Sequence, residues 1–128
     1  MLKKLTPVIV VEEIEPHLSF WVDLLGFEIA IEVLEGERLG FVILAKDGVE
    51  LMMQSRASLR VDNPKIAGEP YREHTPLYFE VDDLDGIKRA LVGADVLIAE
   101  RTTFYRARET IVRTSYGQVV TFAQRLGS

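Results

Sequence analysis

The chain lacks cysteine altogether and has only two histidines among its 128 residues. Without cysteine there is no disulfide, no thiolate metal site and no cysteine nucleophile, and this composition fits a cytoplasmic protein. Lysine and arginine form no block, and the formal net charge is −5. Nucleic acid is therefore not expected as a partner, because neutralising phosphates requires a concentrated basic face.

Long apolar runs are missing as well. No run approaches the roughly 20 residues that cross a bilayer, so no membrane partner is expected. The apolar stretch 8–11 is also too short for the core of a signal sequence. What the chain does contain is 48% hydrophobic and 27% charged residues, enough to build the core of a single domain over 1–128.

The same order of patterns occurs twice along the chain. Thr6-Pro7 opens an apolar run that ends in Glu12-Glu13, and Thr75-Pro76 opens another that ends in Asp82-Asp83. Both acidic doublets are expected at strand-to-helix junctions, where they cap helices or face solvent. Such an internal repeat defines a fold more firmly than local propensity does.

Each repeat predicts a strand, a helix and three further strands. In module one (5–55) the strands are expected at 6–12, 27–33, 39–45 and 49–54, with a helix that begins near Pro16 and ends at Gly26. In module two (74–126) they are expected at 77–81, 95–100, 109–113 and 119–124, with a helix that ends at Gly93. The segment 56–73 is interpreted as a linker between the two modules, in which a short helical turn is possible.

Neither βαβββ module has enough core to be stable alone. We therefore predict an α+β fold in which the two modules form a curved mixed sheet, with helices outside and a concave pocket inside. Alternation predicts that 27–33 is half-buried and that Leu51 and Met53 pack under a helix. His17, on the first helical turn, is expected at the surface.

Three motifs resemble the vicinal oxygen chelate superfamily, which includes glyoxalase I, extradiol dioxygenases and bleomycin resistance proteins. They are Phe20-Trp21 with Leu25-Gly26-Phe27, then Val81-Asp82-Asp83-Leu84-Asp85, then Phe104-Tyr105 through Glu109 with Tyr116-Gly117-Gln118. The resemblance covers essentially the whole chain. It implies paired βαβββ modules and a homodimer.

Metal-dependent members of this superfamily hold a divalent ion with one ligand from each of four strands. The resemblance carries those positions to Thr6, Glu50, Pro76 and Thr121. Only Glu50 is a normal ligand, so no metal and no other cofactor is expected, and the character is closest to the metal-free bleomycin-resistance-like branch. A partial site that joins His74 to Glu50 is the weaker alternative.

Three functions stay open at this stage. The first is binding or sequestering of a small molecule, cationic or aromatic, in the pocket or at a dimer interface. The second is a metal-independent lyase or isomerase with Glu50 or Glu109 as general base. The third is a structural module whose pocket is filled. The expected ligand-binding residues are Thr6, Val8, Glu50, Met52, Tyr78, Tyr105, Glu109 and Thr121. For Glu109, pairing with Arg101, Arg106 or Arg108 is the competing interpretation, since exposed carboxylates usually find a cation.

Overall fold

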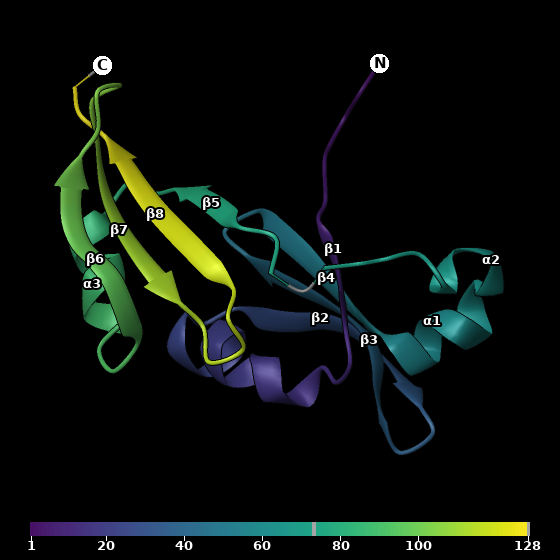
Figure 1. Ribbon diagram of the computed structural model, residues 1–128. Helices are drawn as coiled ribbons and strands as arrows, with labels where there is room; N and C mark the ends of the chain where they lie inside the picture. Colours follow the sequence, from purple (N-terminus) through teal and green to yellow (C-terminus); the bar gives the residue numbers. More distant parts are fainter. Residues whose placement is uncertain (73, 128) are drawn as a thin grey trace. The chain divides into compact units, whose positions relative to one another are not determined.

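Hydrogen bonds between strands divide the protein into two four-stranded sheets (Figure 1). The computed structural model describes residues 1–72 and 74–127. Met1–Glu73 and His74–Ser128 form two compact units, each with its own sheet. The predicted α+β fold built from two βαβββ modules is confirmed, and each module has its own hydrogen-bonded sheet.

The first unit has the sheet order β1-β4-β3-β2, in which β1 is parallel to β4 and the other pairs are antiparallel. Two single-turn helices follow β1, and two short α-helices follow β4 (Figure 1). The elements are β1 (Val8–Val11), η1 (Glu15–His17), η2 (Ser19–Leu24), β2 (Glu28–Glu35), β3 (Arg38–Lys46), β4 (Val49–Ser55), α1 (Arg56–Asp62) and α2 (Pro64–Ala67).

The second unit repeats this topology with the order β5-β8-β7-β6, and β5 is again parallel to its neighbour. Its elements are β5 (Leu77–Glu80), α3 (Leu84–Ala90), β6 (Asp95–Thr102), β7 (Ala107–Arg113) and β8 (Val119–Arg125). The repeat seen in the sequence is thus confirmed as a repeat of structure. Among the described residues, no helix is both long enough and apolar enough to cross a membrane.

The helical segment after β1 ends as its sequence predicts. Gly26 has a φ of 82°, its N–H donates to Val22 O, and the N–H of Phe27 donates to Trp21 O. The bond from Gly26 to Val22 is that of an αL cap, which requires a left-handed residue and therefore favours glycine. The segment itself is a 3₁₀ turn followed by a π-helical turn rather than one α-helix.

His17 is buried, which corrects its predicted surface position. It lies three residues after Ile14 and four before Trp21, and both of these side chains are fully buried. Positions separated by three and four residues share one helical face. The helical spacing therefore places His17 on the same stripe as the core residues.

Strand alternation assigns the faces of the sheets correctly in the centre of the first unit. Leu51 and Met53 are fully buried, as predicted. The edge strand β2 differs, because Ile29, Ile31 and Val33 are all exposed, with 38 to 52% of their surface accessible. The half-burial predicted for 27–33 is therefore wrong in this structure, although the alternation itself correctly predicted a strand.

The segment 56–73, predicted from the sequence to be a linker, contains two helices, α1 and α2. Its last residue, Glu73, lies outside the described residues. Ser55 caps α1 by accepting a hydrogen bond from the N–H of Ser58 at 3.1 Å, and Leu59 is buried. The sequence feature that could have predicted α1 is a capping serine followed by residues with high helix propensity.

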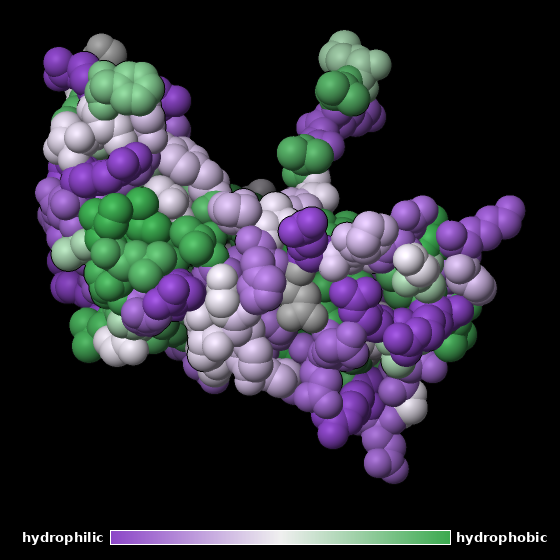
Figure 2. All heavy atoms as spheres, in the orientation of Figure 1, coloured by the Kyte–Doolittle hydropathy of each residue, from purple (hydrophilic) through white to green (hydrophobic). Residues whose placement is uncertain are grey.

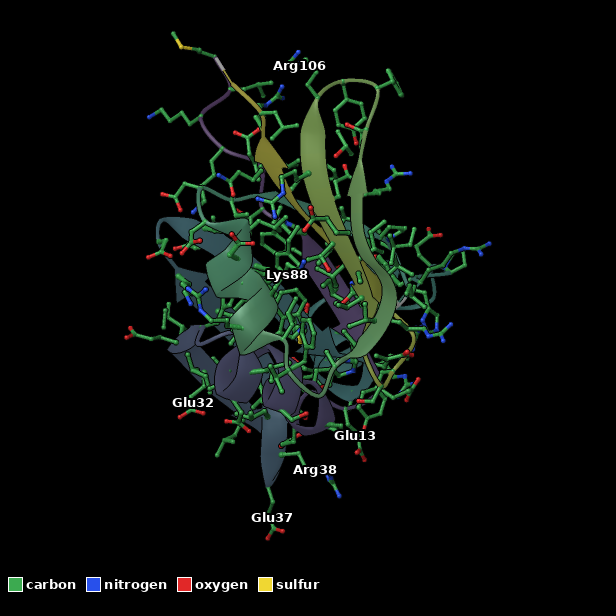
Figure 3. The ribbon with its side chains drawn as sticks, turned by 90° about the vertical axis from the view of Figure 1, so that its left-hand side faces the viewer. Glu13, Glu32, Glu37, Arg38, Lys88 and Arg106 are labelled. Atoms are coloured by element: carbon green, nitrogen blue, oxygen red, sulfur yellow. The ribbon has the colours of Figure 1, made fainter. Side chains whose placement is uncertain are left out.

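The two acidic doublets have different roles. Asp83 caps α3 by accepting a hydrogen bond from the N–H of Gly86 at 3.0 Å, as predicted. Glu12 and Glu13 face solvent, the other predicted role, with 71% and 50% of their side chains exposed. Glu12 pairs with Arg56 at 2.8 Å and Glu13 with Arg38 at 3.3 Å. Figure 3 shows Glu13 and Arg38 at the same end of the first unit.

Candidate functional site

The second sheet has one face covered by α3 and one open face. Figure 2 shows hydrophobic side chains gathered over this sheet on the face turned away from α3. The strand register places Tyr78, Thr121, Ile111 and Ile98 side by side across that face, and Glu80, Ala123, Glu109 and Arg101 form the next row. Charged residues therefore border an apolar surface.

A polar network is built around Glu109 on the open face, and we call Glu109, Tyr105, Arg101 and Tyr78 the Glu109 cluster. Glu109 comes from β7, Arg101 lies opposite it on β6, and Tyr105 belongs to the connection between these strands. Arg101 Nε donates to Glu109 Oε1 at 3.0 Å, and the Tyr105 hydroxyl donates to Oε2. Tyr78, on β5, contributes a further hydrogen bond to Glu109.

Burial within the cluster is unequal. The side chain of Glu109 is 2% exposed, whereas that of its partner Arg101 is 50% exposed. The rings of Tyr78 and Tyr105 are accessible as well, since these residues are 56% and 41% exposed. The cluster therefore places its anion inside the protein and its cation and aromatic rings at the surface.

Electrostatics keeps Glu109 ionised. Burial raises the pKa of its carboxyl group, but hydrogen bonds from Tyr105, Arg101 and Tyr78 outweigh burial, so that the pKa lies below its usual value. Desolvation and the hydrogen bonds to Tyr105 and Glu109 raise the pKa of Tyr78, which stays a neutral phenol. A carboxylate with two occupied oxygens and a lowered pKa binds a proton weakly, which is unfavourable for a general base.

Glu109 was predicted as an exposed carboxylate, and this is corrected: it is buried. Of its three candidate partners, Arg101 is the one that pairs with it. Arg108 pairs with Glu100 and Asp85, and together with Lys88 it lowers the pKa of Glu100 to about 2. Figure 3 shows Arg106 at the tip of the β6–β7 connection and Lys88 on α3.

The remaining predicted site residues of the first unit lie on β1 and β4. Val8 is opposite Met52 in the parallel ladder, and Glu50 lies two positions earlier on the same strand and face. Glu50 accepts a hydrogen bond from Lys4 Nζ. Thr6 lies two residues before β1. The four predicted residues thus lie at one end of the β1–β4 pair. The carboxylate of Glu50 is already paired with the ammonium group of Lys4.

The positions at which the superfamily holds its metal can be compared between the two units. The resemblance equates Thr6 with Pro76, which makes Val8 the counterpart of Tyr78. Since Val8 pairs with Met52 and Tyr78 pairs with Thr121, Thr121 is then the counterpart of Met52, and Val119 that of Glu50. The side chains of Val119 and Pro76 offer no ligand atom. Across residues 1–72 and 74–127, no three His, Cys, Asp or Glu side chains gather as metal ligands do. The donor set therefore does not fit the superfamily's ion.

The imidazole of His74, the alternative donor, lies over Gly117. Its nearest ring atoms are 2.8 Å from the point where a Cβ on Gly117 would be. Gly117 has a φ of 89° in the turn before β8, so this contact requires a residue without a side chain. The partner of His74 in the second unit is thus the β7–β8 turn.

Sequence reasoning named Tyr78, Tyr105 and Glu109 but did not join all three, and it missed the second ion pair on the same face. Arg125 Nε donates to Glu80 Oε1 at 2.7 Å, with both side chains largely exposed. The available signal was strand alternation, which places Glu80 and Tyr78 on one face. The ladder register that brings Glu109 level with Glu80 could not be obtained from alternation alone.

Neither a family model nor a curated protein matches the chain. Solved structures do match over nearly its whole length. A glyoxalase/bleomycin resistance protein/dioxygenase from Nocardioides matches with a TM-score of 0.74 and 16% identity, covering 100% of this chain and 87% of that one. TioX from Micromonospora sp. ML1 matches with a TM-score of 0.71 and 16% identity, covering 98% of each chain.

A glyoxalase/bleomycin resistance protein/dioxygenase family enzyme from Burkholderia phytofirmans PsJN gives a TM-score of 0.68 at 16% identity, covering 93% of this chain and 95% of that one. These likenesses define a class: the chain has the glyoxalase/bleomycin resistance fold. The fold that the three sequence motifs implied is thereby confirmed. Because the same fold carries many functions, activity has to be argued from the residues of the site.

Proposed function

We propose that this protein binds a small molecule without a metal ion, on the open face of the second sheet around the Glu109 cluster. The observation that carries the proposal is a fully hydrogen-bonded buried carboxylate beneath two exposed tyrosine rings on an apolar sheet face. Apolar surfaces with a few fixed polar groups are typical of ligand sites, because apolar contacts supply affinity and polar groups supply orientation.

In this proposal the cluster works by preorganisation. The hydroxyl of Tyr105 is held by Glu109, so its ring is oriented before a ligand arrives, which reduces the entropy lost on binding. Tyrosine rings offer large contact surfaces and prefer stacked or edge-to-face contacts with aromatic ligands. The expected role is capture or sequestration of the ligand rather than its conversion.

A catalytic role for Glu109 is less well supported, because its pKa is lowered and both oxygens already accept hydrogen bonds. Glu50 remains the other candidate general base, although Lys4 occupies one of its oxygens. A purely structural module is the remaining alternative, and it predicts that no ligand binds the open face. The homodimer expected from the resemblance stays a prediction, which light scattering of the purified protein measures.

The test is a titration of ¹⁵N-labelled protein with 1-naphthamide, an uncharged bicyclic aromatic probe. We expect saturable chemical-shift changes confined to the second sheet (β5 to β8) and the β6–β7 connection. Affinity should weaken by roughly fivefold in Tyr105→Ala, through the loss of one aromatic contact. Tyr116→Ala is the matched control, since Tyr116 is 45% exposed but follows β7 at its other end. Binding that is absent, or equally weakened by both substitutions, would contradict the proposal.

A further inference from the structure

In the Glu109 cluster the negative charge is buried and the positive charge is exposed on the open face. Glu109 and Arg101 cancel in net charge, but the carboxylate is 2% exposed and the guanidinium 50% exposed. A ligand on the open face therefore meets the positive end of this pair first. Because a half-exposed guanidinium is less screened than one free in water, it attracts an anionic group at short range.

Arg101 also has hydrogen-bond donors with which it can bind an anionic group. Its Nε donates to Glu109 and a second hydrogen bond joins it to Tyr105, so at least three of the five N–H donors of the guanidinium remain for other partners. A guanidinium fork matches the two oxygens of a carboxylate and binds them through parallel hydrogen bonds. Fixing Nε on a buried carboxylate orients this fork before the ligand binds.

Two further carboxylates on this face are already paired. Glu80, which lies in the same row as Glu109, accepts a hydrogen bond from Arg125 Nε at 2.7 Å. Asp95, which lies opposite Arg113, accepts one from Arg113 Nε at 3.0 Å. These carboxylates are therefore already bound to cations, whereas Arg101 and Arg125 are themselves at least half exposed. This pairing disfavours a cationic ligand, one of the two ligand types expected from the sequence.

Building on the proposed function, we propose that the Glu109 cluster selects aromatic ligands that carry a carboxylate. Arg101 binds the carboxylate through its terminal nitrogens, and the rings of Tyr78 and Tyr105 contact the aromatic body. Glu109 contacts no ligand in this arrangement. It is a positioning residue, since it orients Arg101 and Tyr105 from below.

The experiment compares three probes with the same ring system: 1-naphthoate, 1-naphthamide and 1-naphthylmethylammonium. Affinities for the full-length protein are measured by ¹⁵N chemical-shift titration at low and high salt. We expect the carboxylate to bind roughly tenfold more tightly than the amide, and the ammonium most weakly, because a charge-assisted bidentate contact forms only with the carboxylate. The preference should shrink at 1 M salt.

Substitutions of Arg101 test whether this residue causes the preference for the carboxylate probe. Arg101→Gln should remove the preference for naphthoate over naphthamide, and Arg101→Lys should keep only part of it, because lysine keeps the charge but not the fork. Arg113→Gln is the matched control, since Arg113 also pairs through Nε at 3.0 Å and is 49% exposed, but lies at the other end of the β6–β7 ladder. Amide spectra verify that each variant is folded.

The outcomes separate the two proposals. If all three probes bind equally, or the ammonium binds best, the carboxylate preference is overturned while ligand binding stands. If none of the probes shifts amides of the second sheet, both proposals fall. A preference that survives in Arg101→Gln but not in Arg113→Gln would also overturn the role given to Arg101.

Discussion

The unequal burial of the Arg101–Glu109 ion pair makes a quantitative prediction. Arg101→Leu leaves the 2% exposed carboxylate of Glu109 without its cation, whereas Glu109→Gln returns a 50% exposed guanidinium to water. Removing one partner of a fully buried pair costs about 3–5 kcal/mol. Since Tyr105 and Tyr78 still donate to Glu109, we expect about 2–3 kcal/mol for Arg101→Leu and about 1 kcal/mol for Glu109→Gln.

The cost of Arg101→Leu should depend on pH. In the wild type the pKa of Glu109 lies below its unfolded value, so its stabilisation is present above the unfolded pKa and is lost as the pH falls through the folded one. Without Arg101, burial is less opposed, and the pKa of Glu109 should rise above its unfolded value of about 4.3. The deficit of the variant is then full at pH 7 and shrinks toward pH 4, where Glu109 takes up a proton.

Native-state hydrogen exchange of the β7 and β8 amides measures the unfolding free energy of the second compact unit, to which Arg101 and Glu109 belong. Trp21, the single tryptophan, lies in the first unit, so its fluorescence is not a direct probe of the second. Arg113→Leu, whose partner Asp95 is 54% exposed, is the control and should cost under about 1 kcal/mol. A larger loss for Glu109→Gln than for Arg101→Leu, or a deficit that does not change with pH, would refute the reasoning.

Three further predictions concern the fold. Asp83→Ala should destabilise the second unit by about 1 kcal/mol through loss of the α3 cap, and Asp82→Ala should have little effect, as measured by hydrogen exchange of α3 amides. Gly26→Ala should cost about 1–2 kcal/mol in urea unfolding followed by tryptophan fluorescence, because alanine is strained at a φ of 82°. Met53→Ala should cost about 2–5 kcal/mol in the same assay, and a similar cost for its less buried neighbour Met52 would contradict the assignment of faces.

Local features of this chain were predictable because they depend on neighbours in sequence. The Thr-Pro repeats, the Asp83 cap and the Gly26 terminus follow from backbone preferences and short-range hydrogen bonds. His17 was missed although its spacing from Ile14 and Trp21 carried the information. The helix at 56–62 was missed because only one of its side chains, Leu59, is buried, so its apolar periodicity is weak.

The sequence by itself determined the βαβββ repeat, and through it the fold, because alternation, helical spacing and capping residues are periodic signals that each segment carries alone. The tertiary structure decided what the site residues are. Burial of Glu109, its pairing with Arg101 rather than Arg108 and its bonds to Tyr105 and Tyr78 depend on strand register. This register brings Tyr78 to Glu109, 31 positions away in the sequence, and excludes water from the carboxylate. Desolvation and register are properties of packed strands, and no single segment encodes them.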